Sequence, residues 1–198
     1  MIVSHYNRNK TFFVIISILL FCISCKENNK QLDDATKIVN EWTGKTIQFP
    51  NNLYCTSMGE NYPCIDLYSD KYKILLYVDS LGCTSCHLKL SEWKRIMAES
   101  DSLFSRKIEF ILFFQPKKVD KEELQIIFKE NEFNHPVFID QNIEIDKLNK
   151  FPSKIEYQCF LIDNDNRVIA IGNPSLNHEI WILYKKIIEE KMNENNIR

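Results

Sequence analysis

The strongest chemical signal in this chain is a pair of cysteines separated by two residues, Cys83-Thr84-Ser85-Cys86. A turn of this length brings the two sulfurs within bonding distance, so the pair can alternate between a dithiol and a disulfide. At the start of a helix, unpaired backbone N–H groups would point at the cysteines and favour the thiolate, the form that attacks another disulfide. The residue types and their spacing therefore predict thiol–disulfide exchange.

The residues on either side of the motif predict the strand-to-helix turn that this chemistry needs. An apolar run over residues 73–78 precedes the motif and has the length and composition of a buried strand. After the motif, Leu90, Trp93 and Met97 recur at helical spacing and predict one buried helix face. In this arrangement the first cysteine lies at the exposed helix tip as the nucleophile, and the second lies one turn further in.

His87 extends the motif to a sequence that also attaches c-type haem, because it adds an axial ligand to two cysteines able to form thioethers. A small haem domain is mostly helix and loop, whereas this motif interrupts a strand-and-helix unit, so we expect no haem. Zinc is not expected either, because Cys83, Cys86 and His87 lack a second pair with matching spacing. The dithiol interpretation therefore implies no cofactor and no metal.

Residues 1–24 have the organisation of a secretion signal. Arg8 and Lys10 precede an almost unbroken apolar run, which is shorter than the about 20 residues that a spanning helix needs. Cys25 follows a small residue and starts a polar tether over residues 25–31, a pattern that resembles the lipobox of bacterial lipoproteins. The resemblance implies cleavage before Cys25 and lipidation of its thiol. We expect a cell-envelope protein, anchored to a membrane by lipid and facing the periplasm or the cell exterior; plain secretion and an uncleaved anchor are the alternatives.

The remaining cysteines have to be interpreted for an oxidising compartment, where thiols tend to form disulfides. Without Cys22 and Cys25, five cysteines remain, so at least one is free or pairs only transiently. Cys55 and Cys64 flank an irregular segment, where we expect a structural disulfide that closes the loop; a second exchangeable pair is the alternative. Cys159 falls in a predicted strand, where a free cysteine commonly acts as a small buried hydrophobic residue.

Size and charge set further limits on the function. The whole sequence has a formal charge of −2, and the chain without the signal has a charge of about −4. Neither value suggests nucleic acid or an anionic surface as a partner. Residues 32–198 are long enough to form one domain with a sizeable core.

The order of predicted elements alternates between strands and helices before it changes to a hairpin. Predicted strands cover residues 46–49, 73–78, 107–114, 136–140, 158–162 and 167–171. Predicted helices cover residues 33–44 and 143–148, and three more begin after the motif, at residue 120 and at residue 177. Residues 51–70 show no period and predict a loop, with a short strand near Ile65. Together these elements predict an α/β fold, a central mixed sheet with helices on both faces.

With Cys-x-x-Cys at the end of its first core strand, this order resembles the thioredoxin fold. The short strand and helix between residues 136 and 148, and the pair Phe160-Leu161-Ile162-Asp163 and Arg167-Val168-Ile169, resemble TlpA/ResA-type membrane-anchored thiol–disulfide oxidoreductases over roughly residues 46–192. The resemblance implies a thioredoxin-like domain in which Cys83 is the nucleophile and Cys86 the resolving thiol. It also implies that protein thiols and disulfides are substrates, with an unidentified electron donor or acceptor.

The chain departs from the pattern of this family around the motif. Gly82 replaces the tryptophan usual before the first cysteine, and Tyr77 replaces an acidic residue that in thioredoxins helps to move the proton. The cis-proline that faces the dithiol is missing: the resemblance puts Tyr157 there, so Tyr157 and Gln158 would form the substrate-facing loop. Cys159 then lies where it could serve as an accessory thiol. The missing proline favours an alternative function, a non-catalytic binding module on the same fold.

Overall fold

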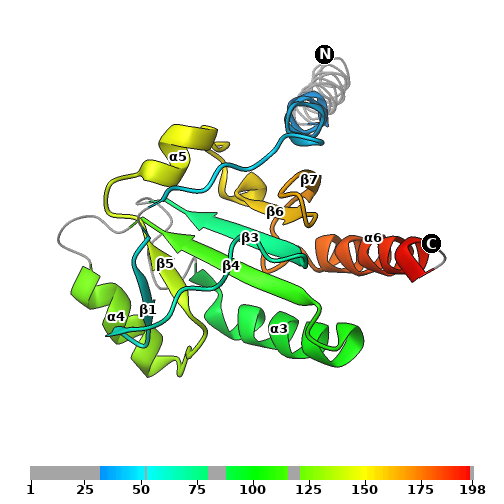
Figure 1. Ribbon diagram of the computed structural model, residues 1–198. Helices are drawn as coiled ribbons and strands as arrows, with labels where there is room; N and C mark the ends of the chain where they lie inside the picture. The colour runs from blue at the N-terminus through cyan, green and yellow to red at the C-terminus, as the bar shows by residue number, and fades with distance from the viewer. Residues whose placement is uncertain (1–31, 52, 80–87, 116–120, 197–198) are drawn as a thin grey trace, which may run out of the picture. The chain divides into compact units, whose positions relative to one another are not determined.

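The computed structural model describes residues 32–51, 53–79, 88–115 and 121–196 (Figure 1). The chain divides into two compact units, Met1–Glu41 and Trp42–Arg198. The described part of the first unit is helical, and the Thr36 hydroxyl donates a hydrogen bond to the Leu32 carbonyl within it. The second unit contains the sheet and all the elements discussed below. No helix within these described ranges has the length and hydropathy needed to span a bilayer.

Seven strands of the second unit form one mixed sheet in the order β2-β1-β5-β4-β3-β6-β7. The strands are β1 (Cys55–Ser57), β2 (Glu60–Asn61), β3 (Tyr72–Val78), β4 (Ile108–Phe114), β5 (Val137–Ile139), β6 (Cys159–Ile162) and β7 (Val168–Ile171). The central strands β3, β4 and β5 run parallel, and the other pairings are antiparallel. This is the mixed sheet that the sequence predicts.

Helices cover both faces of this sheet. They are α3 (Leu90–Phe104), α4 (Lys121–Glu130), α5 (Glu144–Asn149), the short 3₁₀-helix η1 (Ile155–Tyr157) and α6 (His178–Asn196). Figure 1 shows α3 and α6 on one side of the sheet and α5 on the other. Two helix starts are fixed by side chains: both carboxylate oxygens of Asp140 accept N–H groups of α5, and the Asn177 side chain accepts the N–H of Glu179 in α6.

The larger core lies between the sheet and helices α3, α4 and α6. Ile74, Leu76 and Val78 of β3 belong to it, and the buried Trp93 and Trp181 belong to it from the helices. Because side chains alternate across a strand, the intervening residues of β3 are directed to the opposite face. β3 is therefore buried on both sides, as expected for a central parallel strand.

Most predicted elements are confirmed, but the predicted strand over residues 46–49 is wrong. This segment makes one isolated bridge, between Thr46 and Arg167. The side chain of Asn149 accepts the Gln48 backbone N–H at 2.9 Å and donates to the Gln48 carbonyl at 2.8 Å. At Gln48, an asparagine side chain thus makes the hydrogen bonds that a neighbouring strand would make, while the Ile47 N–H still donates to the Asn166 carbonyl.

The prediction of a loop over residues 51–70 with a short strand near Ile65 is also wrong. β1 and β2 form a hairpin earlier in this segment, and the residue near 65 lies outside any strand. Met58 and Gly59 connect them, with φ angles of 52° and 88°, the two positive values that a type I′ hairpin turn requires. A methionine at the first turn position is not a recognisable hairpin signal, which explains the miss.

The helix after the motif does not run back to it without interruption. Lys89 has the left-handed conformation, with φ 47° and ψ 40°, and α3 begins at the next residue. Leu90 and Trp93 are buried as predicted, and Met97 is partly buried against the core beside the fully buried Ile96. The predicted helix face is therefore confirmed, whereas the helix is interrupted at Lys89; the predicted helix start at the motif lies outside the described residues.

Candidate active site

The predicted site follows the C-terminal end of β3 in the sequence. The strand ends at Val78, Asp79 follows it, and the motif comes four residues later in the sequence. Cys83 and Cys86 lie outside the described residues, as do residues 1–24 and Cys25. The structure therefore describes the strand that precedes the motif and the residues around the end of that strand, which are called the frame of the site below.

Gln158 connects the segment before β6 with the end of β3 through hydrogen bonds. Its backbone carbonyl accepts the Tyr77 N–H at 2.9 Å, and its side-chain Nε2 donates to Asp79 Oδ2 at 3.0 Å. The same Nε2 donates to the Pro152 carbonyl, also at 3.0 Å. The side chain is 2% exposed, and its Oε1 is buried without a hydrogen-bond partner among the described residues. One buried amide therefore joins the carboxylate beside the motif to the segment predicted to face the substrate.

The two residues predicted to form that substrate-facing loop differ in placement. Tyr157 is the last residue of η1 and is half-buried, whereas Gln158 points into the protein. Among the described residues no peptide bond is cis, so Tyr157 does not reproduce the geometry of the family's proline. Gln158 thus belongs to the framework of the site.

Aromatic rings support this frame from the face opposite the larger core. Phe151 stacks on Tyr77 at a centroid distance of 4.8 Å and lies 5.3 Å from Phe160. Trp42 lies 4.8 Å from the Phe160 ring, and the Tyr77 hydroxyl donates to Gln115 Oε1 at 2.7 Å. The position that is acidic in thioredoxins therefore holds a tyrosine that packs among rings and bonds to a neutral amide.

Cys159 begins β6 and is fully buried in the larger core. Burial raises the pKa of its thiol far above its ordinary value, because the core disfavours the charged thiolate. The Tyr184 hydroxyl donates to the carbonyls of Cys159 and Gly172, at 3.3 and 2.8 Å. This environment favours the interpretation of Cys159 as a buried packing residue.

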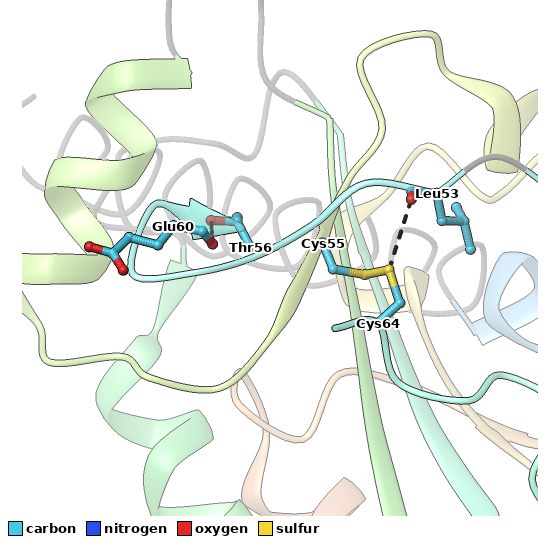
Figure 2. The surroundings of a disulfide bond; sticks show 5 residues. All are labelled: Leu53, Cys55, Thr56, Glu60 and Cys64. Carbon is cyan, nitrogen blue, oxygen red and sulfur yellow. Dashed lines mark hydrogen bonds between the residues drawn. A yellow bond between two sulfur atoms is a disulfide. The ribbon is translucent and has the colours of Figure 1, made fainter. Parts of the chain in front are cut away.

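The structure forms a disulfide between Cys55 and Cys64, with 5.3 Å between their Cα atoms (Figure 2). Cys55 lies in β1 and is 4% exposed, whereas Cys64 follows the β1–β2 hairpin and is exposed. The Cys64 sulfur lies 3.9 Å from the Leu53 carbonyl oxygen, the contact drawn as a dashed line in Figure 2. The bond therefore joins a fixed strand to an irregular surface segment.

This disulfide lies at the same edge of the sheet as the end of β3. The strand register places Val78, Phe114 and Ile139 in one row, and the Ile139 N–H donates to the Tyr54 carbonyl, just before Cys55. Three strand spacings separate β3 from β1, a distance of about 14 Å. The Cys55–Cys64 disulfide and the end of β3 therefore lie at one edge of the sheet, and the Cys-x-x-Cys motif follows β3 in the sequence.

Asp79 lies four residues before Cys83 in the sequence, and the sequence alone indicates no partner for it. The contact with Gln158 joins residues 79 positions apart in the chain, so no local pattern could indicate it. In the part of the chain that the structure describes, no three histidine, cysteine or acidic side chains group as metal ligands would.

The sequence matches no known protein family and no curated protein. Solved structures do resemble the fold. A candidate protein disulfide isomerase from Bacteroides thetaiotaomicron is similar with a TM-score of 0.53 and 15% identity, over 74% of this chain and 88% of that one. The thioredoxin domain of a thiol–disulfide oxidoreductase from Bacteroides vulgatus gives 0.50 and 12%, over 72% and 97%. An uncharacterized thioredoxin-like protein from Porphyromonas gingivalis gives 0.50 and 16%, over 73% and 92%.

These similarities identify the fold and, at such low identities, only the fold. The chain has a thioredoxin-like fold, so the predicted fold is confirmed. Activity does not follow from a fold, because one fold serves many functions.

Proposed function

We propose that the protein is a lipid-anchored thiol–disulfide oxidoreductase outside the cytosol, with Cys83 and Cys86 as its redox couple. One observation carries the proposal: a Cys-x-x-Cys sequence follows the central strand β3 of a thioredoxin-like sheet. A solved protein of similar fold is itself a thiol–disulfide oxidoreductase, which supports this choice of chemistry. The substrates would be protein thiols and disulfides.

The exchange would proceed in two steps that conserve electrons. The Cys83 thiolate attacks one sulfur of a substrate disulfide, forms a mixed disulfide and releases the other substrate sulfur as a thiolate, which takes a proton. The Cys86 thiolate then attacks the Cys83 sulfur and releases the second substrate thiol. The substrate gains two electrons, and the couple becomes a disulfide that a donor dithiol must reduce. With the couple oxidised at the start, the same steps run in reverse.

The described frame gives this chemistry a fixed support. Asp79 leads directly into the segment that carries the motif, and the Gln158 amide holds its carboxylate. The same amide holds Pro152 and hence the segment before β6. A rigid frame of this kind would keep the motif and the neighbouring segment in a constant relation during exchange.

A non-catalytic binding module is the second candidate function. The resemblance aligns Tyr157 with the family's proline, and Gln158 beside it is buried, so the surface that would dock a substrate differs from the family's. A protein that binds a partner without disulfide exchange would retain the fold but would not require a substrate-docking surface.

Trapping of mixed disulfides distinguishes the two functions. In the Cys86→Ser variant of the full-length protein, Cys83 can attack a substrate but nothing resolves the product, so covalent adducts should accumulate in an envelope extract. The Cys83→Ser variant is the matched control and should trap none. Insulin reduction by the wild type should be lost in both variants. If the wild type reduces no insulin and the Cys86→Ser variant forms no adducts, the oxidoreductase proposal is wrong and the non-catalytic binding module is supported.

The lipid anchor has a separate test. Palmitate labelling of the expressing bacterium should mark the wild type, and Cys25→Ser should abolish the label. A label that survives this substitution would contradict lipidation at Cys25.

A further inference from the structure

The Cys55–Cys64 disulfide has one buried and one exposed end. Cys55 is 4% exposed within β1, and Cys64 is exposed in a segment without regular secondary structure. Figure 2 shows the bond reaching from the strand to this outer segment. An exchanging thiolate needs a path to a sulfur atom, so this asymmetry determines which end can react.

The Cys55 end is fixed independently of the disulfide. β1 pairs with β5 through Cys55 and Thr56, and with β2 through Thr56 and Ser57. The Thr56 hydroxyl donates to the Glu60 carbonyl at 2.8 Å, and the Ser57 hydroxyl donates to the Asn134 carbonyl at 2.8 Å. β1 would therefore keep its place if the bond to Cys64 opened.

The Cys64 end is held more weakly. Tyr62 donates its N–H to the Cys55 carbonyl at 3.2 Å, but Pro63 has no N–H to donate. The Cys64 sulfur contacts the Leu53 carbonyl oxygen at 3.9 Å, a long contact for a weak sulfur group. Segments with few buried contacts open at low free energy, so residues 62–66 could move away once the bond is cut.

We propose that Cys55–Cys64 is a second exchangeable disulfide, which a dithiol reductant opens by attack on the Cys64 sulfur. This inference does not depend on the activity of the Cys83–Cys86 couple. One thiolate of the reductant bonds to Cys64, and the S–S bond breaks to leave Cys55 as a thiolate that takes a proton. The second thiol of the reductant then attacks the mixed disulfide and releases the Cys64 thiol. The reductant loses two electrons, and the pair in this chain gains them.

The surroundings fit a protein as the dithiol reductant. Tyr54 and Tyr62 lie within two residues of the disulfide in sequence and are 37% and 51% exposed. Exposed tyrosines are typical of protein–protein contact surfaces. The disulfide also lies at the sheet edge where β3 ends, as the strand register shows. A protein docked at this edge would reach the Cys64 sulfur without disturbing the core.

The test uses the full-length protein with Cys83→Ser and Cys86→Ser, so that failure of the proposed redox couple cannot affect the result. Reduced glutathione is the probe, and mass spectrometry of peptides locates its adducts on the folded protein. We expect at least about tenfold more adduct on Cys64 than on Cys55. Cys159, buried and free, should stay unmodified and serves as the internal reference. A disulfide that opens only after denaturation, or an adduct mainly on Cys55, would overturn the proposal.

Single variants provide a matched second measurement. Cys55→Ser leaves a free Cys64 thiol, and Cys64→Ser leaves a free Cys55 thiol. We expect iodoacetamide to alkylate the first at least about tenfold faster than the second. Near-ultraviolet circular dichroism checks that both variants are folded. Equal rates in two folded variants would contradict the asymmetry; if a variant does not fold, the glutathione experiment on the parent protein decides alone.

Discussion

Replacement of Gln158 with leucine tests whether a single amide joins the segment before β6 to the end of β3. Leucine has a similar volume but lacks the Nε2 donor that bonds to Asp79 Oδ2 and to the Pro152 carbonyl. The backbone bond from Tyr77 to the carbonyl of residue 158 remains. The substitution therefore removes the side-chain connection and keeps the strand pairing.

The contacts of Gln158 give the expected size of the effect. A hydrogen bond to a carboxylate contributes about 1.5–3 kcal/mol, and one to a carbonyl about 0.5–1.5 kcal/mol. Asp79 and Pro152 are both half-buried, so water can partly replace the lost donor and the lower values apply. Leucine also removes the buried Oε1, which lacks a partner among the described residues, and this offsets about 1 kcal/mol. The free energy of unfolding should therefore fall by about 1 kcal/mol.

Urea denaturation followed by tryptophan fluorescence measures this change, because all three tryptophans are buried. Asp79→Asn is the matched control, since it keeps an acceptor oxygen and removes the charge. The two substitutions combined should lose about 1 kcal/mol less stability than the sum of the single losses, because both act on one bond: Gln158→Leu removes it, and Asp79→Asn removes its charge. Wild-type stability in Gln158→Leu, or strict additivity within about 0.5 kcal/mol, would refute the connection.

Three further predictions concern Lys73, Cys159 and the Cys55–Cys64 disulfide. Burial lowers the pKa of Lys73 below 10.5, so the folded state releases its proton before the unfolded state does, and stability should rise as the pH increases from the folded pKa towards 10.5. Lys73→Met should lack this rise in pH-dependent urea denaturation, and an unchanged pH profile would contradict it. Cys159→Ser places a hydroxyl in the core and should lower the free energy of unfolding by about 1–3 kcal/mol. It should leave the potential of the Cys83–Cys86 couple unchanged; a shifted potential would instead support an accessory-thiol role. Replacing Cys55 and Cys64 together by serine should lower the free energy of unfolding by about 2–3 kcal/mol in the chain-entropy model, measured by urea denaturation, and an unchanged stability would show that the bond does not restrain the chain.

Strong periodicity in the sequence predicted the core elements correctly. The apolar runs that form β3 and β4 have the length of buried strands, and Trp181, Tyr184 and Ile188 recur at helical spacing in α6. The hairpin of β6 and β7 was predictable from its turn, where the Asp163 carboxylate accepts the N–H groups of Asp165 and Arg167. These features depend on neighbours in the sequence, which a reader of the sequence can see.

The errors occur where distant residues decide the local structure. Residues 46–49 look like a strand, but the side chain of Asn149, about a hundred residues away, takes the hydrogen bonds of Gln48. The β1–β2 hairpin depends on its pairing with β5 and on a turn whose first residue is Met58. Local propensity cannot anticipate either case, because tertiary contacts override it.

The candidate site was predictable in position and less so in structure. The motif and the end of β3 were recognisable from spacing, whereas the contact between Gln158 and Asp79 joins segments that only the folded sheet brings together. The same holds for the edge shared by β3 and the Cys55–Cys64 disulfide. Sequence patterns identified the reactive residue types, and the sheet topology determines which of them are neighbours.

The redox potential of the Cys83–Cys86 couple tests the central claim most directly. Full-length protein is equilibrated in glutathione buffers of graded ratio, free thiols are blocked, and peptide mass spectrometry separates this couple from Cys55 and Cys64. An exchanging couple should titrate between about −300 and −120 mV, the range spanned by known thiol–disulfide oxidoreductases. A Cys83–Cys86 disulfide that stays closed below about −300 mV would be a structural bond and would contradict the proposed function.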